Sequence, residues 1–185
     1  MASKGTINSI LALRILTLLV LAASIVYTAL NNYKLSDGTK TSFTFLHAYR
    51  YVVAVAAIGF LYTLVQIPLA MYESCTGKRL IHNSSMPYLD LYGDMVISLL
   101  LGSGVGVGLG VTLEMKRFLN PFFDILLSLG LIDVDEARSK ASKFLDKGLI
   151  SSGILLGGFT LMVVTTILSS LNHSSTSSSK GFFFR

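Results

Sequence analysis

Two ionisable residues interrupt long apolar stretches of the sequence and are the first candidates for chemistry. Arg14 lies within Ile7–Leu30, and Asp94 lies near the start of Tyr88–Val111. An aspartate at the centre of a membrane-spanning helix costs about 2.5–3.5 kcal/mol on insertion scales, so such a residue usually has a partner. A guanidinium and a carboxylate at similar depth can form a charge-assisted, bidentate pair. We therefore predict a structural intramembrane pair of Arg14 and Asp94, with Asp90 either at the interface or as a second acceptor.

The alternative for the same two residues is that no pair forms. A long arginine side chain can extend to the headgroup region while its helix stays in the membrane. Arg14 would then reach its own interface, and Asp94 would be hydrated near the headgroups.

No pattern typical of catalysis or metal binding accompanies this pair. His47, His82 and His173 lie in separate loops or helix ends without metal-ligand spacing, and GxSxG, HExxH and CxxC motifs are absent. The glycine series that begins at Gly102 is not a GxGxxG loop, because position 107 is valine, and no Lys-Ser/Thr pair follows as in a P-loop. We therefore predict a protein that is not an enzyme and holds neither a cofactor nor a metal ion.

The elements that carry Arg14 and Asp94 are apolar runs of about 20 residues or more. A helix needs about 20 mostly apolar residues to cross the hydrocarbon core, and backbone hydrogen bonds must close within each span. The composition agrees, since 52% of the residues are hydrophobic and 14% are charged, against about 25% charged in soluble domains. The four runs are Ile7–Leu30, Arg50–Met71, Tyr88–Val111 and Leu149–Leu171. The predicted fold is an all-α membrane protein, a single four-helix bundle over residues 1–171 with a disordered serine-rich tail over 172–185.

The longest polar region, residues 112–148, contains a further apolar stretch. This stretch, FLNPFFDILLSLGLI, is too short to span and is expected to lie on the membrane surface or dip into it. The second half predicts a charged helix from Asp133 to about Lys147, opened by an acidic capping box. The second span is expected to end near Pro68, because proline disrupts the last turns of a helix.

Aromatic and sulfur-containing residues lie near the ends of the second run. Tyr49, Tyr51, Tyr62 and Tyr72 are placed as residues of an interfacial aromatic belt are. Cys75 is the single cysteine, so no intrachain disulfide can form. Beside a span end this residue is either an unmodified thiol or a palmitoylation site.

Glycine recurs at every second position in part of the third run, and this spacing predicts two closely packing faces. Positions four apart share a helix face, and small residues at that spacing let membrane helices approach each other closely. One face holds Gly102, Gly106 and Gly110, a second holds Gly104 and Gly108, and the fourth run repeats the pattern with Gly153 and Gly157. These faces pack either within one bundle or between protomers.

Several stretches, taken in order, resemble one known family. They are a first helix bearing an arginine, HAYRYVVAVAAIGFLYTLVQIPLAMY, DLYGDMVISLLL, and FLDKGLISSGILLGGF before the last helix. Together they are similar to the plant CASP-like family, relatives of the Casparian strip membrane domain proteins and of the MARVEL four-helix fold. The resemblance extends from about Ile10 to Leu171, and the family's intramembrane arginine and aspartate fall on Arg14 and Asp94.

The resemblance implies a plasma-membrane protein with both termini cytosolic that forms homo- and hetero-oligomers with related four-helix membrane proteins. In strip-forming members, such assemblies recruit cell-wall-modifying enzymes and bar lateral diffusion. The first loop, NNYKLSDGTKTSFTF, lacks the ESLPFFTQF-like signature of those members, so a CASP-like scaffold is favoured over a strip-forming protein.

Two further expectations, one about partners and one about function, rest on the residues alone. The basic residues sit in loops between apolar spans, so membrane lipids rather than nucleic acid are the expected partner. The alternative function is a small transporter or channel subunit that uses the Arg14–Asp94 pair.

The distribution of basic residues favours the opposite orientation from the one that the resemblance implies. The two terminal tails and the second loop together hold five Lys and Arg residues, whereas the first and third loops hold eight. By the positive-inside rule alone, both termini would lie outside. We adopt the orientation of the family, which places the sequon Asn83-Ser-Ser85 in the cytosol and predicts that Asn83 carries no glycan.

Overall fold

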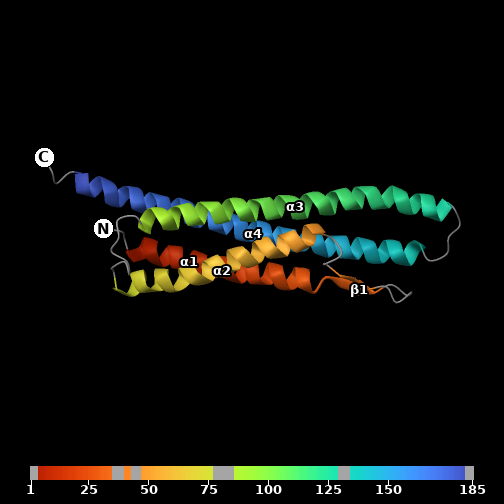
Figure 1. Ribbon diagram of the computed structural model, residues 1–185, viewed down its shortest axis with the longest axis horizontal. Helices are drawn as coiled ribbons and strands as arrows, with labels where there is room; N and C mark the ends of the chain where they lie inside the picture. The colour runs from red at the N-terminus through yellow and green to blue at the C-terminus, as the bar shows by residue number, and fades with distance from the viewer. Residues whose placement is uncertain (1–3, 35–39, 43–46, 77–85, 129–133, 182–185) are drawn as a thin grey trace.

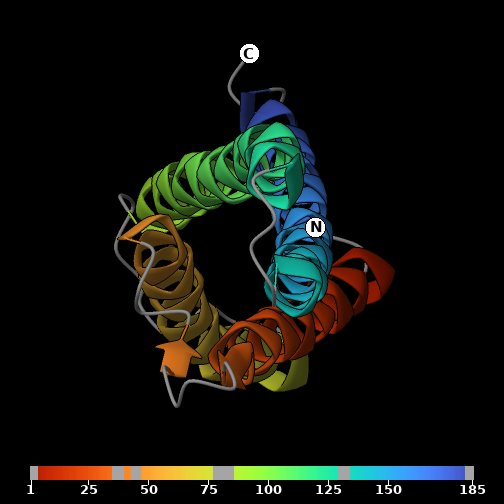
Figure 2. The same cartoon turned by 90° about the vertical axis from the view of Figure 1, so that its right-hand side faces the viewer.

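The computed structural model describes residues 4–34, 40–42, 47–76, 86–128 and 134–181. In this part of the chain, consecutive helices run antiparallel and lie side by side, and the last helix closes the ring against the first (Figures 1 and 2). The helices are α1 Lys4–Ala29, α2 His47–Thr76, α3 Met86–Ser128 and α4 Val134–Gly181. All four are long and apolar enough to cross a membrane. The predicted four-helix membrane bundle is therefore confirmed.

The first loop contains a short antiparallel ribbon that the sequence did not predict. Strand β1, Asn32–Lys34, pairs with β2, Lys40–Ser42, so that Asn32 lies opposite Ser42. The ribbon follows directly on α1 at one end of the bundle (Figure 1).

The inward face of α1 is largely polar, which reverses the pattern of an amphipathic helix in a soluble protein. Its buried residues recur at three- and four-residue spacing and are Arg14, Thr17, Leu21, Ser24 and Thr28. Large apolar side chains of the same helix, such as Leu16 and Leu19, are exposed on its outer face. Lipid tails are as apolar as leucine, so these outward side chains are solvated by the membrane. Polar side chains inside and apolar ones outside are thus expected for a bundle in lipid.

An apolar core occupies the middle of the bundle. All four helices contribute to it, and its most buried members are Leu21, Val55, Leu101, Leu155 and Met162. Each of these side chains is at most 1% exposed. The core therefore separates the two ends of the bundle interior.

Helices α3 and α4 extend well beyond α1 and α2 at one end (Figure 1). The 43 residues of α3 span about 64 Å at 1.5 Å per residue, about twice the thickness of the hydrocarbon core. A hydrogen bond of 2.8 Å between the hydroxyls of Tyr49 and Thr112 marks where α2 begins alongside α3. Beyond Thr112, α3 continues for about 24 Å. We call residues 113–128 and 134–148 the helical extension.

The structure differs from three expectations for these long segments. Residues 118–128 do not form a separate surface segment but continue α3, with Pro121 inside it. Helix α2 continues through Pro68 to Thr76, and α4 is helical through Gly181, where disorder was expected from residue 172. Lengthening an existing helix adds one hydrogen bond per residue without a new nucleation cost, and membrane helices tolerate proline. The charged helix expected from Asp133 is present as the beginning of α4.

Candidate functional site

Arg14 and Asp94 meet inside the bundle. The Nη2 group of Arg14 donates a hydrogen bond of 2.9 Å to Oδ2 of Asp94, and the two side chains are 6% and 0% exposed. Both residues lie in the first half of their helices, and α1 and α3 run in the same direction, so the charges lie at similar depth (Figure 1). The structure thus brings together the two residues singled out in the sequence, and neither extends separately to an interface.

The pair has one hydrogen bond instead of the bidentate geometry that we predicted. The second carboxylate oxygen, Asp94 Oδ1, accepts a hydrogen bond of 2.8 Å from the Tyr62 hydroxyl. The Nε2 group of Gln66 in turn donates to the Tyr62 hydroxyl oxygen at 2.9 Å. Residues four apart on a helix are neighbours on one face, which places both of these side chains on the inward side of α2. Three helices therefore converge on one carboxylate.

A glycine explains how the Tyr62 hydroxyl can reach Asp94. A Cβ atom at Gly93 would lie 2.6 Å from the hydroxyl oxygen of Tyr62, so a larger residue there would displace the phenol. The prediction that Tyr62 belongs to an interfacial belt is therefore wrong. The available signal was the pairing of Tyr62 with Gln66 on one face of an otherwise apolar span.

Asp90 lies at the edge of this cluster and is half-buried. Its Oδ1 accepts a long hydrogen bond of 3.5 Å from Gln66 Nε2, and its backbone oxygen lies 3.4 Å from the Tyr62 hydroxyl. Among the described residues, Arg14 is hydrogen-bonded to Asp94 and not to Asp90. The predicted role of Asp90 as a second acceptor for the arginine is not observed.

The electrostatics of the site favour a structural role over chemistry. Arginine stays protonated in proteins and cannot serve as a base, and the carboxylate of Asp94 is already occupied by two donors. Removing one partner of a buried pair costs about 3–5 kcal/mol, because the remaining charge is left uncompensated. The Nε and Nη1 atoms of Arg14 are buried without a partner among the described residues. Loss of Asp94 would therefore remove the hydrogen bond that the guanidinium makes through Nη2.

A second polar cluster, not predicted from the sequence, lies at the opposite end of the bundle. The Ser24 hydroxyl donates to the backbone oxygen of Ser151 at 3.2 Å, and the Thr28 and Ser151 hydroxyls are hydrogen-bonded. Asn31 Nδ2 donates to the backbone oxygen of Phe144 at 3.0 Å. These contacts join α1 and the residue that follows its last turn to α4. The spacing of Ser24, Thr28 and Asn31, four and then three apart, was the available signal.

The apolar core lies between the two polar clusters. Leu21, Leu101 and Leu155 fill the middle of the bundle and are fully buried. Among the described residues, no continuous series of polar side chains therefore connects the Arg14 end with the Ser24 end.

The structure divides the predicted glycines into inward and outward positions. A Cβ atom at Gly104 would lie 3.0 Å from Val55 Cγ1, and one at Gly108 would collide with Ser152 Oγ. The face of Gly104 and Gly108 therefore packs within the bundle. The other predicted face is divided, because a Cβ at Gly102 would lie 3.2 Å from the ring of Phe159 while its companions are open.

Three predicted glycines have nothing within 4 Å of an added Cβ: Gly106, Gly110 and Gly153. Gly157 would make only an ordinary contact of 3.8 Å, with Val20. Close approaches also occur at glycines outside the predicted series, namely Gly59, Gly93, Gly148 and Gly158. The glycine spacing therefore predicted which residues share a face, but not which face is buried.

Two predictions concern groups that the structure does not describe. Asn83 lies outside the described residues, and the side chain of Cys75, in the last turn of α2, lies outside them as well. The glycosylation and palmitoylation predictions therefore stay predictions.

Comparison with known proteins adds an independent observation. The Casparian strip membrane protein domain matches residues 4–119. The chain is 35% identical to CASP-like protein 4D1 of Sorghum bicolor over 182 residues, which cover 91% of this chain and 93% of that protein. It is 32% identical to CASP-like protein 4D2 of Arabidopsis thaliana over 164 residues, 87% of each chain. No solved structure matches the chain.

Proposed function

Because the chain belongs to the Casparian strip membrane protein family, we propose that it is a non-enzymatic scaffold of the plasma membrane. It is a multi-pass membrane protein with four helices able to span the bilayer. In this proposal it assembles with copies of itself and with related four-helix proteins, and the assemblies organise membrane domains. Cell-wall-modifying proteins are the proposed recruits.

The observation that carries this proposal is the closed interior of the bundle. Transport requires a binding site or pore that opens to each side of the membrane in turn. Here the Arg14–Asp94 pair is held by Tyr62, and the fully buried Leu101 and Leu155 fill the space beyond it. A charge pair fixed among three helices supports a role in holding the bundle shape. The same arrangement counts against a small transporter or channel subunit.

We assign the end that carries both termini to the cytosol, following the family. The helical extension and the β1–β2 ribbon lie at the other end of the bundle (Figure 1). In this orientation they face the cell wall. They then form the part of the molecule that can meet proteins recruited there.

The role of the charge pair is tested by removing one partner at a time. We expect Asp94→Asn and Arg14→Leu each to lower assembly or delivery to the cell surface, since a lone buried charge costs about 3–5 kcal/mol. This is a large part of the 5–15 kcal/mol that stabilises a typical protein. The matched control is Asp90→Asn, because that carboxylate is half-buried and has no bond to the arginine. Wild-type assembly in both single variants would contradict the structural role.

A double variant separates a structural role from charge-dependent transport. Replacing a buried ion pair by uncharged residues of similar volume is often neutral or stabilising. Arg14→Met combined with Asp94→Asn removes both charges and keeps an acceptor oxygen for Tyr62, so we expect it to recover most of the assembly. Flux across reconstituted vesicles that needs Asp94, and that the double variant does not restore, would favour the transporter.

A further inference from the structure

A small pocket lies in the helical extension, between α3 and α4. Its volume is about 120 Å³, and an apolar cavity of about 150 Å³ can hold benzene. The lining includes Leu119 and Phe123 from α3 and Leu145 from α4, while the small side chain of Ser142 leaves the space open. The pocket is thus of the size of one aromatic ring and has a partly apolar lining.

Two ion pairs between the helices lie at this pocket. Lys116 pairs with Asp146, and Arg138 Nη1 lies 2.9 Å from Asp124 Oδ1. Both cations also line the pocket. A cation over the face of an aromatic ring is attracted by about 0.5–1 kcal/mol at exposed sites. An aromatic ring that entered here would meet apolar side chains and two cations that are each paired with a carboxylate of the facing helix.

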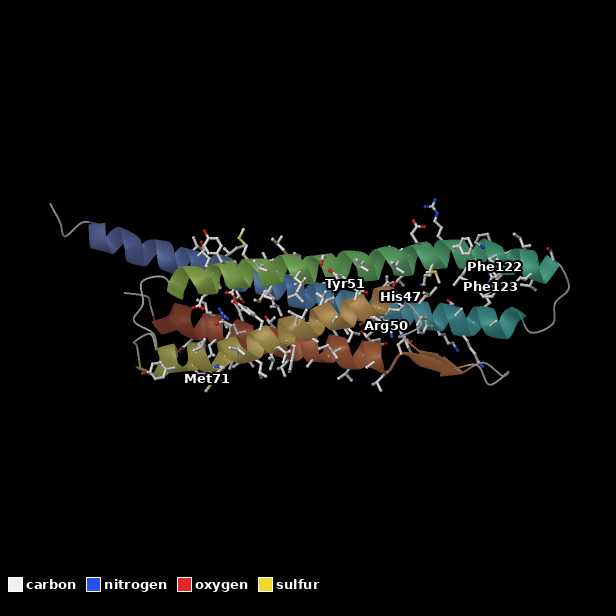
Figure 3. The ribbon with its side chains drawn as sticks, in the orientation of Figure 1. His47, Arg50, Tyr51, Met71, Phe122 and Phe123 are labelled. Carbon is white, nitrogen blue, oxygen red and sulfur yellow. The ribbon has the colours of Figure 1, made fainter. Side chains whose placement is uncertain are left out.

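The same extension exposes an aromatic ridge on another side of α3. Phe118 and Phe122 stack with ring centroids 6.2 Å apart and are 68% and 45% exposed. At 3.6 residues per turn, this ridge lies about 130° around α3 from the pocket residues of the same helix. Figure 3 labels Phe122 and the buried Phe123, which are adjacent in sequence near the free end of the extension. The ridge and the pocket therefore face different neighbours.

Insertion in the membrane fixes the positions of the aromatic ridge and of the pocket along the membrane normal. Copies inserted in the same orientation have the same depth, and the ridge residues Phe118 and Phe122 occupy the same turns of α3 as the pocket residues Leu119 and Phe123. The ridge of one copy is therefore level with the pocket of a neighbouring copy. A surface feature complementary to a pocket elsewhere on the same molecule produces head-to-tail contacts, which close into rings or continue as chains.

We propose that the aromatic ridge of one copy, Phe118 and Phe122, docks against a second copy so that one of its two rings enters the Lys116–Arg138 pocket. The contact is head-to-tail and lies in the helical extension. It rests on the proposed scaffold function and deepens it, because it names the surfaces through which like copies join. It also gives Phe118 and Phe122 a partner, and buried aromatic rings dominate interface energetics.

The contact is tested by crosslinking the full-length protein in phosphatidylcholine vesicles, in a Cys75→Ser background. One tagged version carries Ile125→Cys, which lies one turn from Phe122 on the exposed side of α3 and leaves both ridge rings in place. A differently tagged version carries Ser142→Cys. We expect crosslinked dimers when the two versions share a membrane and none when either version is alone. A crosslink within the Ile125→Cys version alone would show a symmetric contact and would overturn the head-to-tail geometry.

A second measurement uses the pocket without cysteines. Ser142→Leu fills the pocket, whereas Ser142→Ala keeps it open and serves as the matched control. We expect Ser142→Leu and Phe122→Ala each to weaken assembly about tenfold or more, and Ser142→Ala to leave it unchanged. If the protein assembles but Ser142→Leu matches Ser142→Ala and the mixed crosslink is absent, the inference is wrong and the scaffold function stands. A protein that stays monomeric in the membrane would contradict both.

Discussion

The glycine series of α3 offers a sharp test of the packing, because two neighbouring glycines have opposite surroundings. A Cβ added at Gly108 collides with Ser152 Oγ and lies 3.2 Å from both Ser152 Cβ and Val52 Cγ2, whereas one added at Gly110 meets nothing within 4 Å. The variants Gly108→Ala and Gly110→Ala make the same chemical change two residues apart. They differ only in which side of the helix receives the methyl group.

The expected effects follow from two opposing contributions. Alanine in a helix interior is favoured over glycine by about 0.5–1 kcal/mol, and overpacking a filled interior costs about 1–3 kcal/mol. We expect Gly110→Ala to be neutral or stabilising by up to about 1 kcal/mol. Gly108→Ala is expected to be destabilising by up to about 2 kcal/mol. The two variants then differ by about 1–3 kcal/mol, a factor of about 5–150 in the unfolding equilibrium.

The assay is reversible unfolding in lipid bicelles, followed for each variant under identical conditions. Ser152 completes the test, because its hydroxyl is buried and has no partner among the described residues, so Ser152→Ala alone should cost little. In that background Gly108→Ala should be less harmful, although the close Cβ contact remains. Coupling between touching residues is typically about 0.5–3 kcal/mol. Equal effects of the two glycine variants, or no relief by Ser152→Ala, would refute the inward placement of Gly108.

Two further predictions concern the site and the orientation. Tyr62→Phe removes the hydroxyl that donates to the buried carboxylate and should lower the free energy of unfolding by about 1.5–3 kcal/mol. The control Tyr72→Phe, at an exposed residue, should change the free energy of unfolding by less than about 0.5 kcal/mol. Similar losses in both variants would argue against the three-helix cluster. Expressed in plant cells, the wild-type protein should show no change in gel mobility after glycosidase treatment. A shift that is lost in Asn83→Gln would reverse the orientation.

Much of the fold could be read from the sequence. Four apolar runs of sufficient length force helices, because a lipid environment offers no other partner for backbone groups. Successive spans alternate in direction, so α1 and α3 run parallel, which brought Arg14 and Asp94 to one depth. Pairing lowers the cost of two opposite charges at one depth in a low-dielectric medium, so the sequence favoured this contact.

The tertiary structure decided how each helix is rotated about its own axis. Periodicity grouped Gly104 with Gly108 and Gly106 with Gly110, but both groups are equally small, and only the packing shows that the first pair faces inward. Likewise, Tyr62 is suitable for an aromatic belt by composition, and its bond to the carboxylate depends on the approach of α2 to α3. Hydrophobicity cannot set this rotation in a membrane, because lipid and core are both apolar, so side-chain fit and the few polar contacts set it instead.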